Sequence, residues 1–141
     1  MSASELITGE YVINKNVACN MLRSKFYVCP VCGNILYSCG EAMISCCGIT
    51  LTPLEPEKSD GEHRAYVEKS DDEYFVSVNH CMSKEHYISF IAFAHCNGID
   101  LVKLYPEGDG QARFQFRSLG TLYIYCNKHG LFTQKIELNR I

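Results

Sequence analysis

The chain has 141 residues, a formal net charge of −3 and 21% charged residues. This length suits one ordinary domain, or a small metal-stapled module followed by a compact domain. The acidic balance argues against the basic surface that nucleic acid requires, and no apolar stretch reaches the roughly 20 residues of a membrane helix. Residues 1–10 lack the basic and apolar segments of a signal peptide. We therefore expect a cytoplasmic protein with neither nucleic acid nor membrane as a partner.

Residues 1–25 show only weak apolar periodicity, which glycine and several asparagines interrupt. We interpret them as a short N-terminal extension that is helical in part.

Residues 26–56 contain a cysteine pattern typical of a metal-binding module, and residues 57–62 follow as a charged linker. Cys29 and Cys32 precede a glycine, and so do the adjacent Cys46 and Cys47. A glycine in that position allows the positive φ that aims backbone amides at the sulfurs. Four thiolates satisfy zinc or a single iron equally well, and the adjacent pair predicts a distorted tetrahedron. Cys39, inside the intervening loop, is an alternative ligand.

Residues 63–141 have the pattern of an all-β domain. Aromatic and β-branched residues alternate with polar ones, and turn residues recur every eight to twelve positions. We expect turns at Asn97-Gly98, at 106–110 and at 118–120. The predicted strands are 74–79, 87–96, 99–105, 112–116, 121–126 and 131–138. Short strands with this spacing favour a sandwich or a barrel.

Four of the five histidines, together with one cysteine, form a second candidate metal site. Imidazole suits iron, zinc, copper and nickel, and one thiolate makes the ligand set softer. Five protein ligands leave an octahedral metal one open position, which a structural zinc site does not have. The predicted ligands are His63, His80, His86, Cys126 and His129.

The remaining candidates have simpler interpretations. Each histidine taken alone is more often a surface or core residue than a ligand, and His95, in an apolar strand, is expected to be one. Cys19, Cys81 and Cys96 are expected to pack as small buried side chains. The spacing of Cys126 and His129 is more specific, because it places both side chains on one turn.

The chain resembles the superoxide reductase family in its two-centre desulfoferrodoxin form. Residues 26–35 and 46–48 are similar to the desulforedoxin-type module, and residues 80–88 and 125–131 are similar to the catalytic-iron motifs. The resemblance implies an all-β protein, with a small desulforedoxin- or rubredoxin-like module followed by an immunoglobulin-like β-sandwich over 63–141. It also implies superoxide as substrate, a rubredoxin-like electron donor and a homodimer.

The resemblance further implies two metal centres. The first would hold iron or zinc on Cys29, Cys32, Cys46 and Cys47. The second would hold the catalytic iron, with four equatorial imidazoles and one axial thiolate. Those equatorial ligands are His63, His80, His86 and His129, and the axial ligand is Cys126.

Two departures from the family pattern concern the second centre. The family places a glutamate and then a lysine directly before the first histidine, where this chain has Gly61 and Glu62. The lysine that helps to attract superoxide is therefore missing, and Arg64, Lys84 and Lys128 are candidates to replace its charge. Cys81 stands where the family usually has proline.

These observations give one main hypothesis and two alternatives. The main hypothesis is a superoxide reductase that reduces superoxide to hydrogen peroxide by one electron. The first alternative is a redox or metal-sensing module of the same fold with weak turnover or none. The second is a structural protein that binds two zinc ions.

Overall fold

A computed structural model describes residues 21–59, 61–117 and 119–137 of the chain. Over these residues it contains β-strands and one 3₁₀ turn, η1 (Met21–Arg23), and no α-helix, which confirms the all-β prediction. No helix in this part of the chain is long and apolar enough to cross a membrane. Most of the predicted N-terminal extension, residues 1–20, lies outside the described residues.

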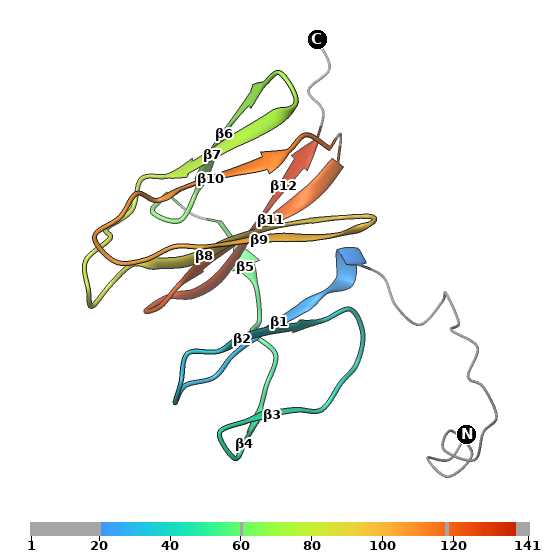
Figure 1. Cartoon of the computed structure of the whole chain (residues 1–141), viewed down its shortest axis with the longest axis vertical. Coiled ribbons are helices and arrows are strands. Elements are labelled where there is room, and N and C mark those ends of the chain that lie inside the picture. Colours follow the sequence, from blue (N-terminus) through green and yellow to red (C-terminus); the bar gives the residue numbers. More distant parts are fainter. Residues whose placement is uncertain (1–20, 60, 118, 138–141) are drawn as a thin grey trace, which may run out of the picture.

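The cysteine-rich segment forms two small antiparallel hairpins at one end of the molecule (Figure 1). Their strands are β1 (Lys25–Val28) with β2 (Ile35–Ser38), and β3 (Ile44–Cys46) with β4 (Ile49–Leu51). Among the described residues, the one buried cluster that these hairpins form by themselves consists of Tyr27, Cys29 and Leu51. A core of this size is too small to stabilise a module alone, so a bound metal would contribute directly to its folding.

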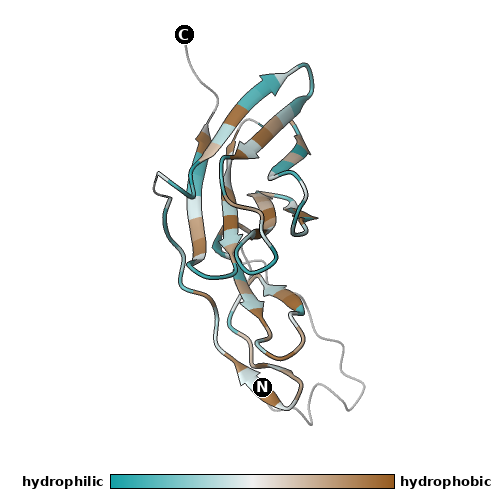
Figure 2. Ribbon diagram, turned by 90° about the vertical axis from the view of Figure 1, so that its left-hand side faces the viewer, coloured by the Kyte–Doolittle hydropathy of each residue, from teal (hydrophilic) through white to brown (hydrophobic). Residues whose placement is uncertain are grey.

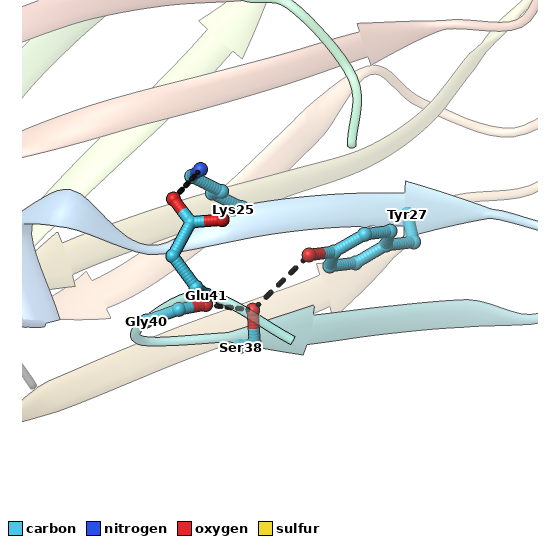
Figure 3. A network of polar contacts seen from close by, with 5 residues as sticks. All are labelled: Lys25, Tyr27, Ser38, Gly40 and Glu41. Atoms are coloured by element: carbon cyan, nitrogen blue, oxygen red, sulfur yellow. Dashed lines mark hydrogen bonds and ion pairs between the residues drawn. The ribbon is translucent and has the colours of Figure 1, made fainter. Parts of the chain in front are cut away.

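Polar contacts connect β1 to the last residue of β2 and to the chain that follows it (Figure 3). The Tyr27 hydroxyl lies 3.3 Å from Ser38 Oγ, which donates to the carbonyl of Gly40 at 2.8 Å. Lys25 Nζ and Glu41 Oε1 form an exposed ion pair at 2.9 Å, a kind of contact that contributes little to stability. The hydroxyl contacts therefore matter more for the path of this segment.

Two sheets make up the rest of the described chain. The three-stranded sheet has the order β10-β7-β6, and the five-stranded sheet has the order β5-β12-β11-β8-β9. Val76 and Phe114 from the first sheet pack against Phe93 and Ile124 from the second. Figure 2 shows bands of apolar and polar residues alternating along several strands, as such packing requires. The strands are β5 (Glu57–Lys58), β6 (Ala65–Ser70), β7 (Glu73–Val78), β8 (Ile88–His95), β9 (Gly98–Lys103), β10 (Gln111–Gln115), β11 (Leu119–Cys126) and β12 (Gly130–Glu137).

Strand β8 is buried along its whole length because both of its faces are covered. One face belongs to the sandwich core, and the other packs against Phe26 of β1. The Phe26 ring lies 5.5 Å from that of Phe90 and 4.9 Å from that of Tyr123. This double coverage explains why β8 is apolar except for Ser89 and His95, as is typical of strands buried on both faces.

All six predicted strands of residues 63–141 are present, with shifted ends, and two strands, β5 and β6, were not predicted. Strand β5 lies within the predicted linker 57–62 and pairs in parallel with β12. Strand β6 escaped prediction because most of its side chains are exposed and charged or polar, so its sequence carries no clear apolar face. The domain boundaries derived from the sequence stay predictions.

Two turns predicted from the sequence are wrong, because in each case a glycine that lies in a strand was interpreted as a turn residue. Gly98 pairs with His95, so the hairpin loop is Cys96-Asn97 and not Asn97-Gly98. Gly120 lies inside β11 and not in a turn. A Cβ atom there would lie 2.3 Å from Phe93 Cε1 and 2.7 Å from the carbonyl oxygen of Ala94. Gly120 is therefore required for close packing on β8 and not for chain reversal.

Candidate metal centres

The four cysteines predicted to share a metal do lie together. The sulfurs of Cys29, Cys32, Cys46 and Cys47 are all within 4.8 Å of one another. Cys32 Sγ is 3.6 Å from Cys46 Sγ, which is 4.0 Å from Cys47 Sγ. The four atoms are thus close enough for one ion, and sulfur-only ligation suits zinc or iron.

Local backbone conformation explains how neighbouring cysteines face the same point. Gly33 and Gly48 have φ values of 74° and 75°, as the sequence predicted. Cys47 also has a positive φ of 54°, which is uncommon for a residue with a side chain. This left-handed conformation turns the Cys47 side chain toward that of Cys46. The sequence predicted a distorted tetrahedron for the adjacent pair, and the structure shows an unusual backbone conformation at Cys47.

The thiols of this group differ in their pKa values. Backbone N–H groups of Cys32 and Val31 lower the pKa of Cys29 to about 7. Hydrogen bonds to the sulfurs of Cys32 and Cys29 raise the pKa of Cys47 to about 12. Four crowded thiolates repel one another without a cation, and a bound metal ion removes this conflict because it stabilises every thiolate. The group fits a metal ion in this respect.

The second set of predicted ligands lies at one end of the sandwich, on loops that meet there. His63 precedes β6, His80 follows β7 and His86 precedes β8. Cys126 ends β11 at an irregularity in its pairing with β8, and His129 lies in the turn to β12. Segments far apart in the sequence therefore contribute to one site.

Four imidazole rings form a closed circuit at this end. The centroid distances are 5.0 Å for His63–His80, 4.6 Å for His80–His86, 4.8 Å for His86–His129 and 5.1 Å for His129–His63. Donor atoms of His63, His80, Cys126 and His129 all lie within 4.8 Å of one another. His86 is outside that tight group but adjoins two of its members. Cys126 is fully buried, and its Sγ lies 3.5 Å from His129 Nδ1.

Hydrogen bonding assigns the nitrogen that is available for a metal in His80. Its Nδ1 lies 2.6 Å from the carbonyl oxygen of Cys81, so Nδ1 carries the hydrogen and Nε2 keeps its lone pair. Among the described residues, Nε2 of His80 and Nε2 of His86 are buried with no hydrogen-bond partner. Buried nitrogens are rarely left unbonded, and a metal ion would satisfy both.

Neighbouring groups favour neutral imidazole at His86. Burial lowers its pKa below 6.5, and the nearby His80, His129 and Lys128 add repulsion, while Glu62 acts in the opposite direction. Neutral imidazole is the form that binds a metal. His63 is buried and stacks on Phe132, with ring centroids 4.0 Å apart and planes 6° apart.

The other cysteines and His95 lie outside both groups. His95 is buried in β8 with Nε2 3.5 Å from Asp100 Oδ2, in agreement with a core or edge role. Cys39 is in a disulfide and is not an alternative ligand. Cys81 and Cys96 are exposed, so the prediction that they are buried was wrong. Both lie in short loops that follow strands, where the apolar pattern no longer applies. Cys19 lies outside the described residues.

The three candidate substitutes for the missing lysine differ in their surroundings. Lys84 is ion-paired with Glu107 at 3.6 Å. Arg64 is exposed and lines a cleft with Lys58 and Lys135. Lys128 is exposed in the turn between Cys126 and His129, and its charge acts on His86. Lys128 is therefore the cation that the structure relates most directly to the histidine circuit.

No model of a protein family matches the chain, but individual relatives do. A desulfoferrodoxin homolog from Archaeoglobus fulgidus is 30% identical over 115 residues, which cover 75% of this chain and 92% of that protein. The chain belongs to the desulfoferrodoxin family. The desulfoferrodoxin of Clostridium acetobutylicum is 29% identical over 102 residues, which cover 70% of this chain and 78% of that protein.

A solved structure supports the fold of this desulfoferrodoxin-family chain. The superoxide reductase from Treponema pallidum superposes with a TM-score of 0.72 at 22% identity, covering 80% of this chain and 98% of that one. The match extends over nearly the whole of that structure, so it confirms the predicted fold, a small N-terminal module followed by an immunoglobulin-like β-sandwich. The resemblance inferred from the two pairs of motifs is confirmed at the level of family and fold.

Proposed function

We propose that this chain is a superoxide reductase, which reduces superoxide to hydrogen peroxide by one electron. The observation that supports this best is the closed circuit of four imidazoles beside one buried thiol, in a chain of the desulfoferrodoxin family. The proposed ligands of the catalytic iron are His63, His80, His86, His129 and Cys126.

The residues of the site would have distinct roles. When bound, iron supplies the electron that superoxide takes up. Cys126, as a thiolate, would hold the metal and would donate electron density to it, as thiolate ligands do in haem enzymes. The imidazoles act as neutral ligands, and the carbonyl of Cys81 fixes the tautomer of His80. Lys128 supplies positive charge near the site in place of the missing lysine.

The four-cysteine group would hold iron or zinc. Iron there would supply one-electron redox chemistry, whereas zinc, which has none, would only stabilise the module. The external donor in this proposal is a reduced rubredoxin-like protein, and the protein acts as a cytoplasmic homodimer. Light scattering on purified protein would measure the oligomeric state directly.

One experiment tests the proposed reaction. Protein from its native host is analysed for metal and then mixed anaerobically with superoxide and reduced rubredoxin, while peroxide and oxygen are both measured. We expect iron in the preparation, rubredoxin oxidation and peroxide without oxygen. Oxygen evolution, or superoxide decay no faster than the spontaneous rate, would contradict the proposal. Zinc found after overexpression would decide nothing alone, because thiolate sites take up whichever metal is available.

A second candidate function has one observation in its favour. Glu62 replaces the family's lysine, and its negative charge acts on His86. A negative charge at that place repels an anionic substrate, which suits a redox or metal-sensing module with weak turnover. Slow superoxide reduction in Glu62→Lys as well as in wild type would favour the module, whereas a slow wild type and a fast variant would favour an attenuated enzyme. Two zinc ions in native protein would favour a structural role instead.

A further inference from the structure

The side chain of Asn127 is bonded on both sides of His86. Its Oδ1 accepts from the backbone N–H of Tyr87 at 2.9 Å, and its Nδ2 donates to the carbonyl of Glu85 at 3.0 Å. Its own backbone N–H donates to the carbonyl of Tyr87 at 3.1 Å. Asn127 lies next to Cys126, so these bonds connect the cysteine turn to the loop that carries His86.

Gln134 makes a comparable set of bonds to residues that precede and follow His63. Its Oε1 accepts from the backbone N–H of Ala65 at 2.9 Å, and its Nε2 donates to the carbonyl of Ala65 at 2.8 Å. The same Oε1 accepts from Ser59 Oγ at 3.2 Å. Ser59 and Ala65 lie on the two sides of His63 in sequence. The amide of Gln134 thus bonds to β6 as a neighbouring strand would.

We propose that Asn127 and Gln134 are positioning residues that hold His86 and His63 in the circuit of metal ligands. This inference rests on the proposed function, since it treats those histidines as ligands of one metal. The hairpin of β11 and β12 then organises nearly the whole site. It carries Cys126 and His129 itself, and through two side-chain amides it places two further ligands that come from other parts of the chain.

Each side-chain amide acts on one particular histidine, Asn127 on His86 and Gln134 on His63. Both amides use a donor and an acceptor at once, so each fixes a backbone segment in position and in orientation. A backbone amide that is deprived of its partner must find water or move, and either change would shift the attached imidazole. Outer groups of this kind typically contribute 10–100-fold to metal affinity.

The first test measures how fast a chelator removes iron from the full-length protein. Iron at the second centre is followed by the absorption band that Cys126→Ser abolishes, so the four-cysteine centre does not contribute. We expect Asn127→Ala and Gln134→Ala each to accelerate iron loss by about 10–100-fold. Gln115→Ala, an exposed residue of β10, is the matched control and should change the rate by less than about twofold.

A double-variant comparison separates positioning from a general loss of stability. In a His86→Ala background, Asn127→Ala should increase the rate of iron loss by less than about twofold, while Gln134→Ala should keep its full effect on that rate. In a His63→Ala background the pattern should reverse. A purely structural role would give each amide variant the same effect in both backgrounds and would overturn the inference.

Two outcomes distinguish this inference from the proposed function. Wild-type protein that binds iron with the thiolate band, but loses it no faster in either amide variant, would contradict the positioning role alone. Absence of the band from iron-loaded wild type would overturn both. If the alanine variants do not fold, Asn127→Asp and Gln134→Glu keep the acceptor oxygen and lose the donor, so iron loss should fall between wild type and the expected alanine values. Wild-type rates in both of these variants would overturn the inference.

Discussion

The two candidate metal centres are built in opposite ways. The four-cysteine group comes from two turns, at residues 29–33 and 46–48, and its geometry depends on local backbone conformations such as the positive φ of Cys47. The histidine and cysteine group comes from loops spread from His63 to His129, and its geometry depends on hydrogen bonds between those loops. The first centre is therefore a local structure, and the second is a product of the complete sandwich.

This difference predicts where each centre is sensitive. A local centre should respond mainly to changes in its own ligands, since little else positions them. An assembled centre should respond to its ligands and also to residues that never touch the metal, such as Asn127, Gln134 and Phe132. The following experiments test this contrast, from the largest expected effect to the smallest.

Replacing the buried thiol of the second centre should have the largest effect. Cys126→Ser removes a direct ligand, so we expect loss of the thiolate-to-iron absorption band and a fall in superoxide reduction beyond the 10–100-fold typical of outer groups. Stopped-flow spectroscopy measures both. Cys32→Ser is the matched control in the other centre and should leave this band in place. A band that survives Cys126→Ser would contradict the assignment of Cys126 as a ligand.

Removing the buried cysteine of the first centre should chiefly affect stability. Cys29 is 1% exposed in a very small core, and metal binding contributes directly to the folding of such modules. We expect Cys29→Ser to lose the metal of that centre and to lower the free energy of unfolding by at least about 2 kcal/mol. Metal analysis and thermal unfolding measure these changes. Loss of the second centre's metal as well would show that the two sites are not independent.

Phe132 tests whether packing alone influences the second centre. Phe132→Ala removes a buried ring that stacks on His63, so we expect a loss of about 3 kcal/mol in unfolding free energy and weaker metal binding at that centre only. Phe132→Leu retains most of the volume and should cost less than about 1.5 kcal/mol. Equal weakening of both centres by Phe132→Ala would contradict the contrast drawn above.

Surface charge near the second centre should have a smaller effect. Lys128→Ala should slow the reaction with superoxide by about 2–10-fold at low ionic strength, and the difference should shrink as salt is added. Pulse radiolysis at several salt concentrations measures this rate. Lys69→Ala, whose ammonium lies over the Phe116 ring, is the matched charge control and should have little effect. Equal slowing by both variants would indicate a net-charge effect and not a local one.

Acid should weaken the metal-free protein slightly through His86. The folded pKa of His86 lies below 6.5, mainly because of burial, so the unfolded chain takes up its proton first as the pH falls. Stability is therefore lost as the pH falls from about 6.5 toward the folded pKa. We expect the melting temperature of metal-free protein to fall less in His86→Ala than in wild type between about pH 7.5 and about pH 5.5. An identical fall in both proteins would contradict this.

The same local-versus-assembled difference explains what the sequence could predict. Cys29, Cys32, Cys46 and Cys47 were identified from spacing alone, because their turns are encoded by adjacent residues. The histidine set was also proposed from residue type and spacing, but nothing in the spacing of His63 and His86 indicates that their loops meet, and only the family resemblance assigned the equatorial and axial roles. Gln134 gave no signal, because an amide in a strand is common and its partner, Ala65, is distant in sequence. Asn127, between Cys126 and His129, could have been suspected from its place in the motif.

Glycine and strand predictions failed for related reasons. Gly120 was interpreted as a turn residue, but its role is to admit the Phe93 ring, and the sequence does not show which side chain approaches. Strand β6 has an exposed outer face, so its pattern of burial is too weak to stand out. In both cases the structure depends on another strand: Phe93 of β8 packs at Gly120, and β7 pairs with β6.

The double coverage of β8 has a consequence for shortened versions of this protein. A fragment consisting of the sandwich alone would leave Phe90, Ala92 and Ala94 more exposed to water, because Phe26, Val28 and Ile35 of the cysteine-rich segment belong to the same apolar cluster. Such a fragment would tend to associate through this apolar strip, however well its histidines were arranged. A soluble single-centre version would therefore need polar replacements on that face of the five-stranded sheet, and its metal chemistry could then be studied without the cysteine module.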